Sequence, residues 1–147
     1  MSKQNPLTET RELGTLLHRA AALGRADFGR AAESLGLTAP MARVLLMLKE
    51  PTPMRRIAEF LVCDASYVTG VADQLEAAGL AKREDGAGRR VRLLAATKSG
   101  AAVRARIPKA VSAESTALGV LDDASRAQLT ELLQRLVDAS PRKNGSC

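Results

Sequence analysis

Hydrophobic positions recur every three to four residues over the first half of the chain, a period typical of helices with one buried face. The first such segment runs from about residue 8 to about residue 35, and Gly36 follows it as a candidate C-cap. A second segment begins at Thr38, a residue type that caps helix N-termini, and ends before Pro51 and Pro53. We expect the extended link at these prolines to add one short strand beside a later hairpin.

Two shorter helices follow, separated by a tight turn at Val62 and Cys63. The first covers about residues 54–61. Asp64 is placed to cap the second, because its carboxylate suits both the free amides and the positive end of a helix, and Gly79 closes it. The inward stripe of this second helix consists of Val68, Val71, Ala72 and Leu75. Its opposite face carries Ser66, Thr69, Gly70 and Asp73, with Ala65 and Tyr67 beside them near the start.

Between residues 80 and 97 the period changes to alternation, which predicts a β-hairpin. We expect its first strand at residues 80–83, its turn at 85–88 and its return strand at 89–93. Val91, Leu93 and Ala95 alternate with Arg90, Arg92 and Leu94, so that one face is solvated at its basic end.

The last third of the chain returns to helical spacing. Thr97 is expected to cap a long helix through Leu118, and Pro108 is expected to kink or break it. Asp122 or Asp123 is expected to cap a final helix that carries several leucines. The predicted fold is therefore mainly α (α+β).

Composition narrows the class of protein. The chain has 147 residues and is 46% hydrophobic, which excludes a disordered chain, while aromatic residues make up only 2%. No apolar run approaches the roughly 18 residues of a membrane span, and the polar N-terminus leads into no signal-peptide core. We expect a cytoplasmic protein with no membrane partner. The alanine- and arginine-rich composition favours a GC-rich bacterial genome.

Positive charge is concentrated in one segment. The net charge is +6, yet residues 82–109 alone hold nine Lys and Arg against two acids, a net charge of +7. The rest of the chain is therefore close to neutral. A solvated cationic face is common in proteins, but here the charge directly follows a helix-turn-helix, and a helix-turn-helix with a basic wing binds duplex DNA.

In such a unit the start of the second helix touches base edges in the major groove. The candidate base-reading residues are Ala65, Ser66, Tyr67, Thr69 and Gly70. Arg89, at the wing tip, is a candidate for the minor groove. The candidate phosphate contacts are Arg55, Arg56, Arg90, Arg92 and Lys98. The second helix itself contains no Lys or Arg.

Other chemistry finds little support in the sequence. There is one histidine, His18, which we expect to pack in a core, and no Cys/His pair or nucleotide-binding motif. We therefore expect no enzyme, no metal and no cofactor. The two cysteines, Cys63 and Cys147, form neither a metal-ligand spacing nor a disulfide framework. Cys63 is interpreted as a small buried side chain, and a thiol switch at this turn is an alternative.

Taken together, these pieces resemble the MarR family of winged helix-turn-helix transcriptional regulators over roughly residues 38–100. The matching pieces are, in chain order, residues 38–48, Ile57-Ala58 with Leu61, Asp64-x-Ser66-x-Val68-Thr69, residues 75–80, Arg83, Arg89-Arg90 and Thr97-Lys98-Ser99-Gly100. Two departures stand out: Gly88 replaces the usual wing Asp, and Gly70 stands where a basic side chain is common.

The resemblance implies an obligate homodimer that addresses both halves of a near-palindromic operator in double-stranded DNA. It implies dimerisation regions at residues 1–36 and 98–140 and a DNA-binding lobe at 37–97. The tail at residues 141–147 is expected to be flexible because of its terminal position. The resemblance also implies a repressor relieved by a small-molecule effector. Two alternatives stay open: a winged-helix module that binds protein, and a DNA-binding regulator controlled through the thiol of Cys63.

Overall fold

The computed structural model describes residues 6–88 and 90–139, and over these residues the chain is mainly helical, as predicted. The elements, in chain order, are α1 (Pro6–Glu33), α2 (Ala39–Met47), β1 (Thr52–Pro53), α3 (Met54–Leu61), α4 (Ala65–Ala77), β2 (Ala81–Asp85), β3 (Arg92–Ala96), α5 (Lys98–Glu114), α6 (Thr116–Gly119) and α7 (Asp123–Ala139).

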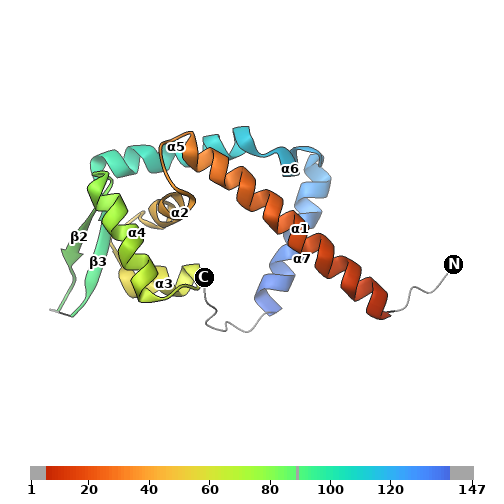
Figure 1. Ribbon diagram of the computed structural model, residues 1–147, viewed down its shortest axis with the longest axis horizontal. Coiled ribbons are helices and arrows are strands. Elements are labelled where there is room, and N and C mark those ends of the chain that lie inside the picture. The colour runs from red at the N-terminus through yellow and green to blue at the C-terminus, as the bar shows by residue number, and fades with distance from the viewer. Residues whose placement is uncertain (1–5, 89, 140–147) are drawn as a thin grey trace.

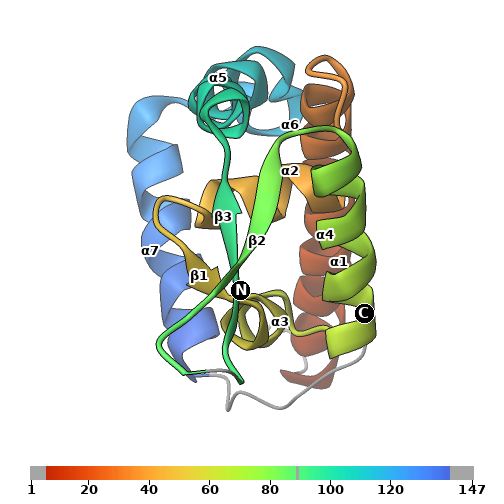
Figure 2. The same cartoon turned by 90° about the vertical axis from the view of Figure 1, so that its left-hand side faces the viewer.

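The elements form a lobe and a helical extension (Figure 1). Helices α2, α3 and α4 and the three strands gather at one end of the molecule, and this part is called the lobe below. Helix α5 leads away from the hairpin, while α1 and α7 extend beyond the lobe (Figures 1 and 2). The helix-turn-helix and its hairpin therefore stand on one side of a long helical scaffold.

The sheet is antiparallel with strand order β1-β3-β2, so the predicted short strand beside the hairpin is confirmed. The hairpin strands, however, start and end later than predicted. The amide of Gly86 donates to the carbonyl of Val91 over 2.8 Å, and the β2–β3 ladder begins only at the pair Asp85 and Arg92. Gly88 takes a φ of +108° in this wide loop, a conformation that favours glycine.

The burial along β3 also differs from simple alternation. Leu94, which alternation groups with the arginines, is fully buried, whereas Val91 is 40% exposed. The reason is that β3 is the central strand, where Leu94 pairs with Thr52 on one side and Arg83 on the other. Val91 lies before the ladder, in the loop.

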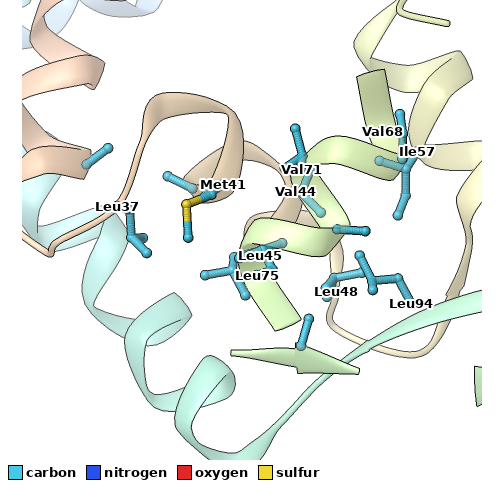
Figure 3. Close-up of a cluster of buried hydrophobic side chains, with 14 of the residues drawn as sticks. Leu37, Met41, Val44, Leu45, Leu48, Ile57, Val68, Val71, Leu75 and Leu94 are labelled. Carbon is cyan, nitrogen blue, oxygen red and sulfur yellow. The ribbon is translucent and has the colours of Figure 1, made fainter. Parts of the chain in front are cut away.

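The core of the lobe is aliphatic and joins all three of its helices to the sheet. Leu45 of α2, Ile57 of α3, Leu75 of α4 and Leu94 of β3 are each completely buried in one cluster (Figure 3). Fully burying one such side chain contributes roughly 1.5–3 kcal/mol. The predicted inward stripe of α4 is confirmed, because Val68, Val71, Ala72 and Leu75 all belong to this cluster.

The helix caps predicted from the sequence are confirmed at Thr38 and Asp122. The hydroxyl of Thr38 accepts the amide of Met41 over 3.4 Å, and Gly36 has the expected left-handed φ of +72°. Of the two candidate caps for α7, Asp122 holds the position, since its carboxylate accepts the amide of Ser125 over 2.8 Å.

The long C-terminal helix does not break at Pro108, where the sequence suggested a kink or break. Helix α5 continues to Glu114, and a separate short helix, α6, begins at Thr116. The buried carboxylate of Asp27 in α1 accepts the amide of Ala117 and the hydroxyl of Thr116, each over 3.0 Å. These bonds, first the one from Ala117, lower the pKa of Asp27. A distant acid on α1 thus holds the start of α6.

Helices α1 and α7 keep large apolar side chains in solvent. Helix α7 has no buried residue, and the outer two-thirds of α1 are exposed, including His18, for which a packed position was predicted. The exposed apolar side chains on these two helices are Leu7, Leu13, Leu16, Leu17, Leu23, Leu132, Leu133, Leu136 and Val137. Among the described helices, none is long and apolar enough to cross a membrane.

A tight joint connects the lobe to α5. The hydroxyl of Thr97 accepts the amide of Gly100 over 3.0 Å and donates to the carbonyl of Gly79 over 2.7 Å. Gly100 packs directly on the main chain of Leu80: a Cβ built on Gly100 would lie 1.8 Å from the Leu80 carbonyl oxygen. Only glycine fits here without moving the backbone, so α5 starts in direct contact with the segment that follows α4.

We expect Gly100→Ala to destabilise the protein by roughly 1–3 kcal/mol, because the added methyl group overpacks a rigid main-chain contact. Urea denaturation at fixed protein concentration measures the change. Gly70→Ala is the matched control: a Cβ there meets nothing within 4 Å, and alanine is the better helix former by about 0.5–1 kcal/mol. Equal stability of the two variants would contradict the claim that Gly100 is packed too closely on Leu80 to accept a side chain.

Candidate nucleic-acid interface

The turn between α3 and α4 is short and sharply bent. Val62 follows α3 with a φ of 57°, a left-handed conformation that is rare for a β-branched residue. The amide of Cys63 donates back to the carbonyl of Ala58 over 3.0 Å, which closes the end of α3. Helix α4 begins two residues later, so α3 and α4 form the helix-turn-helix that the sequence predicted.

Asp64 organises the start of α4. One of its carboxylate oxygens accepts the Ser66 hydroxyl over 2.6 Å and the Tyr67 amide over 2.9 Å. These two bonds, the one from Ser66 being the stronger influence, hold the pKa of Asp64 below its ordinary value of 3.8. The first turn of the helix is therefore fixed while it stays exposed to solvent.

The structure brings the five candidate base-reading residues together on this exposed end. Ala65, Ser66, Tyr67, Thr69 and Gly70 all lie in solvent, opposite the buried stripe of the helix. The Ser66 hydroxyl donates to Asp64, and the Thr69 hydroxyl donates to the Ala65 carbonyl over 2.9 Å. With those protons engaged, the two hydroxyl oxygens face solvent chiefly as acceptors.

The candidate phosphate contacts are exposed as well. Arg55 and Arg56 lie at the start of α3, where Arg55 forms an ion pair with Glu59 over 3.0 Å. Arg90, Arg92 and Lys98 are exposed along the return side of the hairpin and at the start of α5. Arg89, the candidate for the minor groove, lies outside the described residues.

Arg83 has a role that the sequence did not indicate. In the sequence, Arg83 is one of the nine Lys and Arg residues that give residues 82–109 their positive charge. In the structure, however, its guanidinium is largely covered by α4. It donates to Asp73 over 2.6 Å and to the Thr69 carbonyl over 3.3 Å, and it forms a second ion pair with Glu76. Hydrogen bonding to Asp73 is the first of the effects that raise the pKa of Arg83.

Cys63 differs from its prediction. It is half-buried in the turn rather than buried, and it is disulfide-bonded, whereas the sequence predicted no disulfide framework. Within the part of the chain that the structure describes, no group of three or more His, Cys, Asp and Glu side chains could hold a metal ion.

A small cavity of about 290 Å³ opens beside the helix-turn-helix, another feature that the sequence did not indicate. It lies between α2 and the start of α4, and its lining includes Pro40, Arg43, Leu61, Cys63 and Tyr67. The guanidinium of Arg43 lies 5.3 Å from the ring centroid of Phe28, a cation–π distance. The cavity thus combines an apolar wall, one cation and a residue of the exposed α4 end.

We expect Asp64→Ala to destabilise the protein near neutral pH, because the variant loses the cap of α4. The folded-state pKa of Asp64 is lowered, so its contribution is present above the unfolded pKa of about 3.8 and is lost as the pH falls through the lowered value. Urea midpoints of parent and variant should converge at acid pH. A difference that stays constant over the whole range would contradict the assigned role.

Comparisons with known proteins bear on what this arrangement does. No protein-family model and no curated protein matches the sequence. Among solved structures, a MarR-family transcriptional regulator from Rhodococcus sp. RHA1 is similar with a TM-score of 0.79 and 26% identity, over 91% of this chain and 96% of that one. CouR from Rhodococcus jostii RHA1, bound to p-coumaroyl-CoA, has a TM-score of 0.75 and 26% identity, over 88% and 94% of the two chains.

A third similar structure is a MarR-family protein of Mycobacterium tuberculosis in complex with p-aminosalicylic acid. Its TM-score is 0.68 at 28% identity, and the match covers 84% of this chain and 97% of that one. The similarity to these three structures thus covers 84–91% of this chain. This chain has the winged-helix fold of the MarR-family transcriptional regulators, and the resemblance seen in its sequence is confirmed.

Proposed function

We propose that the chain is a sequence-specific, double-stranded DNA-binding transcriptional regulator, a repressor whose binding is relieved by a small molecule. One observation carries the proposal: the exposed start of α4 presents small polar side chains in the same lobe as Arg90, Arg92 and Lys98, which are exposed and form no ion pair with a described residue. This combination suits a helix that enters the major groove while the wing follows the backbone. The similar solved structures are transcriptional regulators, which supports the same function and not an enzyme.

The proposed contacts divide by type. Ala65, Ser66, Tyr67, Thr69 and Gly70 meet base edges in the major groove, where the hydroxyl oxygens accept from base amino groups and Ala65 packs against a thymine methyl. Arg89 enters the adjacent minor groove. The phosphate backbone is held by Arg55, Arg56, Arg90, Arg92 and Lys98.

The functional unit is a homodimer that binds a near-palindromic operator. The exposed leucines of α1 and α7 support this assembly, because large apolar side chains gathered in solvent on helices outside the core of the lobe mark an interaction surface. In this division, residues 1–36 and 98–140 form the dimerisation region and residues 37–97 the DNA-binding lobe. Because its target is genomic duplex DNA, the protein acts in the bacterial cytoplasm.

The cavity beside Tyr67 is the proposed effector site. Its size suits a single-ring compound, and Arg43 supplies a positive charge for a carboxylate. Two of the similar structures hold aromatic ligands, p-coumaroyl-CoA and p-aminosalicylic acid. A ligand in this cavity contacts Tyr67, a residue that also faces DNA, so ligand and operator compete for one side chain.

The function is tested by a mobility shift with the intergenic duplex beside the protein's own gene, with unrelated competitor DNA present. We expect a saturable complex whose affinity falls roughly a thousandfold or more between 50 and 200 mM salt, because several phosphates are neutralised together. A complex that disappears with competitor, or no binding at all, would favour a module that binds protein. Binding that changes between oxidising and reducing conditions in the parent but not in Cys63→Ser would identify redox control through Cys63.

The wing arginine gives a variant for the same assay. We expect Arg89→Ala to weaken operator binding without changing the circular dichroism spectrum, because the substitution removes the proposed minor-groove contact. If the variant binds the operator as tightly as the parent, the minor-groove assignment of Arg89 is wrong.

The dimer is tested on α7. Leu136→Glu should convert the dimer to a monomer in sedimentation velocity, since the charge would be buried unpaired at the proposed interface. Gln128→Glu on the same helix adds the same charge at an exposed polar position and should leave the dimer intact. A parent protein that sediments as a monomer would contradict the proposed assembly.

A further inference from the structure

If α4, the proposed recognition helix, enters a groove of DNA, its own side chains bring negative charge toward a negatively charged duplex. The helix carries two acids, Asp73 and Glu76, and no Lys or Arg. Asp73 lies one helical turn after Thr69 and Gly70 on the same exposed face. A carboxylate at that position would bring negative charge close to the phosphates of a bound duplex, and like charges held close together weaken binding.

Arg83 of β2 forms ion pairs with both of these acids. Its guanidinium reaches across from the hairpin to Asp73 over 2.6 Å and also forms an ion pair with Glu76. Its main-chain amide donates to the second oxygen of Glu76 over 2.8 Å. With the further bond to the Thr69 carbonyl, the side chain has partners on three turns of α4 and is only 21% exposed.

This burial distinguishes Arg83 from the other cations of the wing. Arg90, Arg92 and Lys98 are exposed, and none of them forms an ion pair with a described residue. The Arg83 guanidinium has its donors turned toward α4, and its strand position opposite the buried Leu94 sets that direction. It is therefore poorly placed to bind a phosphate itself.

We propose that Arg83 is a positioning residue for DNA binding, which neutralises the acids of α4 and fixes the angle between wing and recognition helix without touching DNA. The proposal rests on the proposed function.

The test is a mutant cycle in the full chain, read by operator affinity at several salt concentrations. In the parent background, Arg83→Gln should weaken binding by about tenfold or more, because two uncompensated carboxylates then face the duplex. In the Asp73→Asn/Glu76→Gln background, the same substitution should cost less than about threefold. The slope of log affinity against log salt concentration should not change with Arg83→Gln. Arg92→Gln should make that slope shallower by about one unit, the change expected when one phosphate contact is lost.

The opposite pattern overturns the proposal. Equal loss in both backgrounds, together with a shallower salt slope, would make Arg83 a direct phosphate contact, and no loss in either would leave it without a role in binding. If Arg83→Gln alone fails to fold, the Asp73→Asn/Glu76→Gln background still decides, since the proposal requires that adding Arg83→Gln there change the affinity by less than about threefold. Failure of the parent itself to bind any duplex would overturn the proposed function, and this inference with it.

Discussion

The placement of the recognition helix depends on the aliphatic core beneath it. Leu45, Leu75 and Leu94 come from α2, α4 and β3 and are completely buried together. Because interiors of this kind are close-packed, α4 cannot rotate about its axis without opening a cavity or forcing a clash. Since the helix is amphipathic, the burial of one stripe turns Ser66 and Thr69 outward. The face of α4 that is proposed to meet DNA is thus a consequence of the face that is buried.

Two further contacts fix the position of α4 relative to the hairpin and to α5. Arg83 joins the hairpin to α4 through Asp73, and Gly100 packs against Leu80 where the lobe meets α5. The hairpin is therefore held to α4 by Arg83, and the lobe is held to α5 by the contact between Gly100 and Leu80. In a homodimer built through α1 and α7, these connections would set the spacing between two recognition helices. That spacing would in turn select the distance between operator half-sites.

Much of this organisation could be predicted from sequence because it is encoded locally. Caps such as Thr38 and Asp64 act on amides two or three residues away, and an apolar stripe reports helix orientation directly. The features that escaped prediction depend on residues far apart in the chain. The break before α6 is set by Asp27, more than 80 residues earlier. The partners of Arg83 lie on another element, and the burial of Leu94 follows from its place in a central strand.

The central claim is that α4 enters the major groove as one of a symmetric pair. Hydroxyl-radical footprinting of the protein on the intergenic duplex beside its own gene, combined with methylation interference at guanine N7, tests it most directly. We predict two symmetric sets of major-groove contacts whose centres lie about one helical turn, 10–10.5 base pairs, or a multiple of it apart, with protection of the adjacent minor grooves by the wings. Uniform protection without symmetry, or binding that guanine methylation never affects, would contradict the account.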